Sequence, residues 1–454
     1  MKALIFVKIP NARHWLLKAA AAFALPLACV CARAQYSEFH EDRLLLETLV
    51  EKGVLSGDEA EQARKNMAAI PEVSMKDPFA KRFRLGMYAQ ARVQAINQDY
   101  YNETSSGSDL ACGLALRRVV WFYNADFECD FHLIVAINLA EKVPFDSLQV
   151  RKTVDSGAFD GNLIFGIFKP DFTMEYTAGS RIKTPERSIT NTFWGGKDMG
   201  FDDTNHERKG NQCFAGNYIG ISWKGKMPFD KRFTWGASVT NAKNAHWNYI
   251  DKDIGLGYWL NAGYEVHREG LNLQSGLNFG YSTNVTSAYD PANNGAKRCS
   301  EFGFAPYIIL EYGGIFLQSE IVVTSMEHGK TVSDDRAVYT TASRTSTPRG
   351  GMAMFGYGFD IAQWGRLEPI FRIAHINTDG AGVSESNVIY KIKSLNGYYN
   401  KVNAYYAGLN WYLDGNNLKV LTGFEFFQFY DSPTGAVQKN CDVSVFITQM
   451  QIMF

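Results

Sequence analysis

The residues best suited to chemistry are basic side chains gathered in one long polar segment. Lys169 directly precedes Pro170, and further basic residues follow in the same segment. An Arg guanidinium can donate two hydrogen bonds to one oxyanion, whereas a Lys ammonium is a mobile point charge. A pore needs contacts that are firm enough to admit a solute and weak enough to release it. We therefore predict a pore constriction that binds anions, built from Lys169, Arg181, Lys183 and Arg187.

Acidic residues share this segment and predict a second role for it. Glu175 and Glu186 carry the charge needed to pair with arginines, either within the segment or on a surrounding wall. We predict that both glutamates tether the segment. The same tethering is an alternative role for Lys169 and for Arg187, and the sequence leaves both roles open.

Four further arginines are candidates for the wall of the lumen. They are Arg84, Arg92, Arg117 and Arg118. Successive residues of a strand point to opposite faces, so one member of the adjacent pair Arg117 and Arg118 would face the apolar side. We expect a β-bulge or a position near the rim to resolve this conflict.

The segment that carries these groups begins where an alternating apolar strand meets Pro170. Proline has no N–H to donate to a strand ladder, so pairing should end there. Residues 169–210 then form the longest interruption between strands, and a loop of this length inside a compact domain is usually functional. We predict that the loop folds back into the lumen of a barrel and narrows the pore.

From Phe83 onward, apolar and polar residues alternate with the period of two that is typical of β-strands. In the first strand, Leu85 and Met87 lie on one face, and Gln90 and Arg92 lie on the other. The alternation recurs in residues 127–138, 254–265 and 271–281. This repetition predicts an all-β fold, a transmembrane antiparallel β-barrel whose apolar side faces lipid and whose polar side surrounds water.

Short turns alternate with longer polar loops along the chain. We expect turns near residues 124–125, 226–230, 268–270, 313–314, 363–365 and 415–417. We expect loops at residues 99–109, 169–210, 243–252, 285–297, 328–349, 379–395 and 431–440. Tight turns at one rim and long loops at the other are typical of outer-membrane barrels, and the count predicts about 16 strands. The last strand must pair with the first, because hydrocarbon offers no partner for free backbone groups.

The N-terminal residues predict export. Residues 1–34 are typical of a signal peptide: basic residues precede an apolar core, and Ala32-Arg33-Ala34 fits Sec signal cleavage near Ala34. Residues 35–82 predict a short α-helical periplasmic extension and a linker. Its helices could pack on each other or on partner subunits, or the extension could be loosely ordered. The barrel is expected to occupy residues 83–454.

Charge and composition exclude several classes of protein. Removing the first 34 residues leaves 41 Lys and Arg against 47 Asp and Glu, a formal charge of −6, which argues against a nucleic-acid partner. Five cysteines remain, so at least one is unpaired within the chain, and no pairing is favoured. No histidine lies in a catalytic motif, and His206, among acidic neighbours, is the closest to a metal-like cluster. We predict no enzyme, no cofactor and no metal site.

Several pieces of the chain resemble the phosphate-selective porins O and P. They are Gly166-Ile167-Phe168-Lys169-Pro170, the following Phe172 and Glu175, Glu186-Arg187-Ser188, the pair Arg117-Arg118, and the helical lead-in at residues 44–55. The resemblance implies a 16-stranded barrel, usually trimeric, with the third long loop folded inward. It also implies lumenal Arg and Lys that pass phosphate or other anions.

Taken together, these patterns predict a porin in the outer membrane of a Gram-negative-type bacterium. It would be surrounded by outer-membrane lipid and would pass small hydrophilic solutes by passive diffusion. The resemblance favours phosphate-like anions and implies a homotrimer. Two alternatives stay open: a non-selective or other-solute channel, and a surface adhesin or receptor on a plugged barrel.

Overall fold

The computed structural model of the chain describes residues 80–102, 106–127, 130–140, 145–155, 157, 160–178, 182–195, 201–202, 207–208, 214, 216–241, 255–290, 295–327, 345–385, 389, 399–432 and 438–453. All of them lie in the second of two compact units, Ser74–Phe454. The predicted signal peptide and the predicted helices of the extension lie outside the described residues. Strand structure begins at Ala80, slightly before the predicted start at Phe83.

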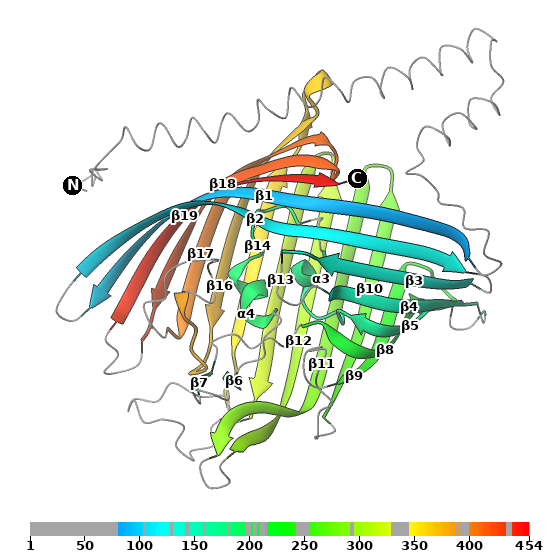
Figure 1. Cartoon of the computed structure of the whole chain (residues 1–454), viewed down its shortest axis with the longest axis horizontal. Helices are drawn as coiled ribbons and strands as arrows, with labels where there is room; N and C mark the ends of the chain where they lie inside the picture. The colour runs from blue at the N-terminus through cyan, green and yellow to red at the C-terminus, as the bar shows by residue number, and fades with distance from the viewer. Residues whose placement is uncertain are drawn as a thin grey trace. The chain divides into compact units, whose positions relative to one another are not determined.

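The described strands form one antiparallel sheet that closes on itself (Figure 1). They are β1 (Ala80–Asn102), β2 (Ser106–Phe127), β3 (Phe131–Asn138), β4 (Phe145–Val154), β5 (Gly161–Phe168), β8 (Tyr218–Lys226), β9 (Phe233–Asn241), β10 (Leu256–Arg268), β11 (Leu271–Asp290), β12 (Gly295–Tyr312), β13 (Ile315–Met326), β14 (Arg349–Tyr357), β15 (Phe359–Asp360), β16 (Arg366–Asn377), β17 (Lys401–Asp414), β18 (Leu418–Tyr430) and β19 (Gln438–Met453). β14 and β15 both pair with β16 and make one wall strand, so the described wall has sixteen. The predicted barrel is confirmed.

Closure depends on the pairing between the first strand and the last. β1 pairs with β2 on one side and with β19 on the other, in a register that runs from Tyr88 opposite Met453 to Tyr101 opposite Asn440 and, after a shift, to Asn102 opposite Gln438. The predicted pairing of the two ends is therefore confirmed. Since every wall strand has a neighbour on both sides for at least part of its length, most of the backbone N–H and C=O groups in the wall are bonded within it.

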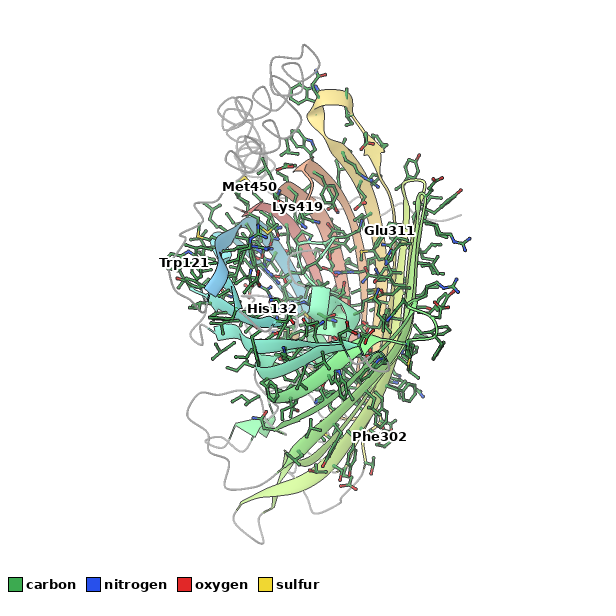
Figure 2. All side chains as sticks on the ribbon, turned by 90° about the vertical axis from the view of Figure 1, so that its right-hand side faces the viewer. Trp121, His132, Phe302, Glu311, Lys419 and Met450 are labelled. Carbon is green, nitrogen blue, oxygen red and sulfur yellow. The ribbon has the colours of Figure 1, made fainter. Side chains whose placement is uncertain are left out.

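The outward face of the wall is apolar and the inward face is polar, the reverse of a water-soluble protein. One row of directly paired outward residues crosses neighbouring strands and is apolar and exposed: Val150, Phe165, Ile221, Val239 and Tyr258. Figure 2 labels two further exposed aromatics, Trp121 and Phe302. The inward face instead buries polar and charged side chains, among them Gln90, Arg92, Glu320, Arg372 and Lys419. This inversion is the burial pattern of a barrel that stands in lipid.

Short elements lie outside the wall strands. α3 (Met174–Ala178) and α4 (Ile189–Trp194) belong to the long loop after β5, β6 (Phe201–Asp202) pairs with β7 (Glu207–Arg208), and a 3-10 turn spans η3 (Ala362–Trp364). None of the helices in the described residues has the length and apolar character that crossing a membrane requires.

Three local predictions about connections are wrong. The turn expected at residues 124–125 is strand, because Asn124 pairs with Arg84 on one side and with Ile134 on the other. Most of the loop expected at residues 99–109 is also strand, since β1 and β2 stay paired up to Tyr101 opposite Ser106. Most of the loop expected at residues 285–297 is strand as well, because β11 and β12 stay paired up to Asp290 opposite Gly295. In all three places cross-strand pairing outweighs the low strand propensity of Asn, Asp and Gly. The other five predicted turns lie between strands.

The assignment of the two faces predicts unequal effects of one added charge. Replacing Ile321, an exposed outward residue near the middle of β13, with Lys should lower the free energy of unfolding by about 2–4 kcal/mol. Gln318→Lys on the inward face of the same strand should lower it by less, because Gln318 borders the open cavity, where the added ammonium can stay hydrated. Guanidinium denaturation of barrels refolded in lipid vesicles, followed by Trp fluorescence, measures both. Equal losses would contradict the assignment.

Candidate functional site

The loop after β5 lies across the interior of the barrel, where Figure 1 shows α3 and α4 between the walls. It contacts strands from every part of the ring. Polar contacts reach it from β1, β2, β8, β10, β11, β13, β14, β16, β17 and β18. A segment held on so many sides has one position in the lumen.

An aromatic cluster holds the start of the loop. The ring of Phe172 packs edge-on against Phe214, with centroids 4.5 Å apart, and against Trp259 of β10 at 6.1 Å. Gly303 on β12 makes room for it, because a Cβ there would lie 2.9 Å from the Phe172 ring. The backbone is fixed as well: Asn278 donates to the Phe172 carbonyl at 2.9 Å. These contacts position the first turn of the loop, including α3.

Glu175 joins the two halves of the loop. Its carboxylate accepts hydrogen bonds from the Ser188 backbone N–H at 2.8 Å and from the Ser188 hydroxyl at 2.6 Å. Ser188 in turn caps α4 by accepting from the Asn191 N–H. The other Glu175 oxygen lies 3.4 Å from Arg372 of β16, which also donates to Glu425 at 2.8 Å. Glu175 is therefore a fully buried charge with partners on both the loop and the wall.

Glu186 joins the loop to the first two strands. One oxygen accepts a hydrogen bond from Arg92 of β1, and the other lies 2.5 Å from Arg117 of β2. Arg117 is the extra residue of a β-bulge, since the partners of β1 step from Arg118 opposite Gln90 to Leu116 opposite Ala91. Because of this bulge, Arg117 can point inward beside Arg118, which resolves the conflict that the strand pattern predicted.

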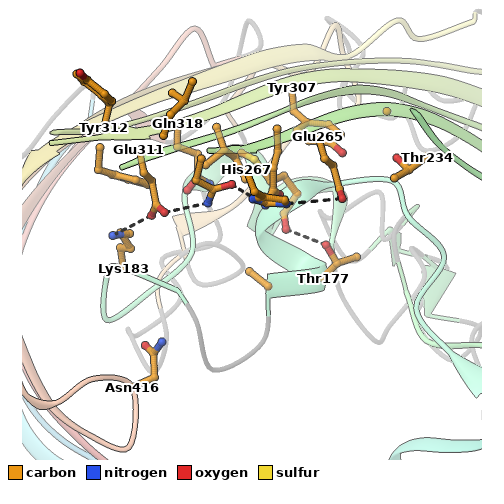
Figure 3. Close-up of a pocket in the computed structure, with 18 of the residues that line it drawn as sticks. Thr177, Lys183, Thr234, Glu265, His267, Tyr307, Glu311, Tyr312, Gln318 and Asn416 are labelled. Atoms are coloured by element: carbon orange, nitrogen blue, oxygen red, sulfur yellow. Dashed lines mark hydrogen bonds and ion pairs between the residues drawn. The ribbon is translucent and has the colours of Figure 1, made fainter. Parts of the chain in front are cut away.

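Of the predicted basic residues that the structure describes, Lys183 lines the open part of the lumen. Its ammonium lies 2.9 Å from Glu368 and 3.6 Å from Glu311, above the Phe316 ring. Figure 3 shows Lys183 reaching from the loop to Glu311 on β12. Its backbone is also fixed, because Asn410 donates to the Lys183 carbonyl at 2.7 Å.

The remaining predicted residues lie in different places. Lys169 pairs with Asp146 at 3.2 Å and lies over the Tyr176 ring. Arg187 covers the same ring, at 4.9 Å, and donates to the Glu175 carbonyl. Arg84 is half exposed and lies 3.7 Å from Asp126. Arg181 lies outside the described residues, and so does His206.

The open space is a cavity of about 1850 Å³ on the turn side of the loop. Its walls include the turn residues Gly270, Gly313 and Gly415, so it opens at the turn rim, and Met174 and Lys183 of the loop bound its inner end. Seven carboxylates and six Lys or Arg side chains line it, so its charges nearly balance. At the rim the hydrogen bond from Lys231 lowers the pKa of Asp160, which keeps that carboxylate charged.

Sequence reasoning missed several wall residues that hold the loop. They are Asp146, Lys224, Trp259, Asn278, Gly303, Glu368 and Arg372. The period of two in their strand places Glu368 and Arg372 on one face, and this pattern could have identified them as inward residues. The neighbouring sequence does not indicate which loop residues they contact. No group of His, Cys, Asp or Glu among the described residues has the arrangement of a metal site.

Comparison with known proteins gives the fold and no closer relationship. No protein-family model matches the sequence, and no curated protein matches it. OprB of Pseudomonas putida is similar in structure, with 11% sequence identity, coverage of 82% of this chain and 94% of that one, and a TM-score of 0.49. OmpF of Salmonella typhi, in complex with daunomycin, has 13% sequence identity, coverage of 82% of this chain and 98% of that one, and a TM-score of 0.49. An anion-selective porin from Comamonas acidovorans has 10% identity, 82% and 100% coverage, and a TM-score of 0.50. The shared feature is the porin-type barrel; the resemblance to the porins O and P stays a prediction.

Removing the charge of Glu186 should loosen the loop. Glu186→Gln leaves Arg92 and Arg117 without their carboxylate partner, and Arg92 is buried. Breaking a buried ion pair by removing one partner typically costs 3–5 kcal/mol; because Glu186 is partly exposed, we expect a loss of about 2–3 kcal/mol in unfolding free energy. Denaturation in vesicles measures it, with Glu269→Gln in the exposed β10–β11 turn as the control. A loss no larger than that of the control would mean that the other contacts hold the loop alone.

Proposed function

We propose that this chain is an outer-membrane porin of a Gram-negative-type bacterium, through which small hydrophilic solutes diffuse passively. The observation that carries the proposal is the combination of an apolar outer face, a polar inner face and a cavity of about 1850 Å³ bounded by an inward loop. A passive pore needs no catalytic group. It needs a lumen whose polar lining replaces part of the hydration shell of the solute.

In this proposal, residues 169–195 form the constriction. Glu175 and Glu186 act as tethers. The Glu175 carboxylate bonds Ser188 of the loop and Arg372 of the wall, and the Glu186 carboxylate, itself on the loop, bonds Arg92 and Arg117 of the wall. Arg92 and Arg117 serve the same purpose from the wall. Lys183 is the residue that we expect to meet the solute, since among the described members of the predicted constriction set (Lys169, Lys183 and Arg187) it borders the cavity.

The finer proposal is a preference for phosphate-like anions in a homotrimer, as the resemblance to the porins O and P implies. Basic side chains gather where the loop meets β1, β2 and β4: Arg92, Arg117, Arg118, Lys169 and Arg187. Fewer carboxylates interact with them, namely Asp146, Glu175 and Glu186. Because the cavity itself is nearly balanced in charge, we expect a modest anion preference rather than exclusion of cations.

A second candidate is a plugged barrel that serves as an adhesin or receptor. The observation that favours it is the number of strands that the loop contacts, which would suit a seal as well as a constriction. Conductance separates the two candidates, since a seal passes no current.

Ion selectivity tests the porin directly. The full mature protein in a planar bilayer under a KCl gradient should give stable conductance steps, and the reversal potential should lie on the chloride side of zero. Absence of conductance would exclude the porin and favour the plugged barrel. A reversal potential on the potassium side of zero would exclude the anion preference but not the porin.

Neutralising Lys183 should reduce any anion preference. One unit charge at about 4–8 Å in water is worth roughly 0.5–1 kcal/mol, so Lys183→Gln should change the anion-to-cation permeability ratio by roughly two- to fivefold. Arg232→Gln is the matched control, because Arg232 lies in an exposed turn and does not line the cavity. The same bilayer measurement compares the two variants. Equal anion-to-cation permeability ratios in the two variants would mean that Lys183 does not lie on the conduction path.

A further inference from the structure

A second segment of the chain is buried on the loop side of the constriction. It belongs to the connection between β16 and β17, of which the structure describes residues 378–385, Ile389 and 399–400. Connections between strands usually run over the surface, in contact with water. Here Val383, Glu385 and Ile389 are at most 5% exposed. We call residues 378–385 together with Ile389 the second inward segment.

A tight turn and a backbone pairing fix this segment. Asp379, Gly380 and Gly382 have φ angles of 47°, 81° and 72°, a left-handed conformation in which the chain reverses sharply. Val383 and Tyr399 then exchange backbone hydrogen bonds at 3.0 and 2.9 Å. The segment is thereby held beside the start of β17.

The wall next to this segment departs from the polar character of the rest of the inward face. On the turn side of the constriction, the inward residues of β18 and β19 include Lys419, Gln449 and Gln451. On the loop side they are apolar and buried: Phe427, Phe429, Cys441, Val443, Val445 and Ile447. Apolar side chains that lined a water-filled lumen would lose the favourable free energy of burial. This part of the wall therefore needs an apolar cover.

The second inward segment supplies that cover together with α4. Ile389 lies with Ile189 of α4 and Val445 of β19 around a space of about 20 Å³, which has room for about one water molecule. Val383 and Phe193 belong to the same apolar core. By contrast, the cavity on the turn side of the constriction has about 1850 Å³. Side chains of the described residues thus fill the loop side of the lumen beside β16–β19 and β1.

We propose that the second inward segment closes this sector of the lumen, and that solute passes the constriction between the loop and β2–β4 instead. The inference rests on the proposed porin function. Two ion pairs between the constriction loop and the wall differ as this division requires. Arg372 of β16 and Glu175, in the closed sector, are 1% and 0% exposed, whereas Lys169 and Asp146 of β4 are 19% and 23% exposed. Water reaches the second pair and not the first.

The thiol of Cys441 tests this closure in the unaltered protein. Cys441 is buried on the inward face of β19 in the same apolar core as Val383, and Cys112 is exposed. Folded protein in detergent is treated with N-ethylmaleimide, and mass spectrometry of its peptides measures modification at each cysteine. Cys112 should react at least severalfold faster than Cys441, which should react once the barrel is unfolded. Similar rates at both thiols in the folded protein would overturn the proposal.

A charge in the apolar core should open the closed sector. Val383→Asp buries a carboxylate among apolar side chains, so the segment should leave the wall. A second water route beside the first should raise the single-channel conductance in a planar bilayer roughly twofold, and Cys441 should react at least severalfold faster. Val383→Ile keeps an apolar side chain, and Leu139→Asp adds the same charge at an exposed position after β3, so both controls should leave the two measurements unchanged.

Two outcomes with a folded Val383→Asp barrel would overturn the proposal. In one, Cys441 stays as protected as in the unaltered protein. In the other, Cys441 becomes reactive while the conductance stays unchanged, which would place the segment off the path of the solute. Heat-dependent migration on a gel verifies folding, and Val383→Thr, which adds a hydroxyl at nearly the same shape, is the milder variant, with smaller changes in the same direction. An unaltered barrel that protects Cys441 but passes no current overturns the porin and not the closure.

Discussion

The structure depends on one constraint: a sheet that stands in hydrocarbon must bond its own backbone groups. Pairing of β1 with β19 meets that constraint along the seam of the barrel, over a register that runs from Tyr88 to Asn102. Closure then sets everything else in place. It divides each strand into a lipid side and a lumen side, and it gathers polar side chains from distant parts of the chain around one enclosed space.

That enclosed space creates a second requirement, which the loop after β5 meets. Arg92 and Arg372 are buried on the inward face, and a buried charge without a partner is costly. The loop supplies Glu186 and Glu175, and the wall in turn supplies donors for the loop carbonyls. Wall and loop each supply bonding partners that the other needs, so these contacts hold the loop in one position in the lumen. What remains open is the turn-side cavity, where Lys183 stands between two carboxylates.

Much of the fold could be predicted because its signals are local. A period of two marks each strand, Pro170 ends β5, and glycine-containing turns mark one rim. The errors occurred where partners decide the conformation: Asn124 and Asp99 lie in strands because strands flank them on both sides. The adjacent arginines of β2 show what the sequence pattern could predict and what it could not. The pattern required a bulge or a rim position, and only the register with β1 identified the bulge and made Arg117 its extra residue.

The sequence by itself determined that this chain is a closed antiparallel barrel with an apolar exterior and a long loop after β5, because alternation and proline act within a few residues. The tertiary structure decided which charges meet. Lys169, Lys183 and Arg187 look alike in the sequence, yet one pairs with Asp146, one borders the cavity between Glu311 and Glu368, and one covers Tyr176. Their partners lie on strands far away in the chain, and only closure of the barrel brings them within bonding distance.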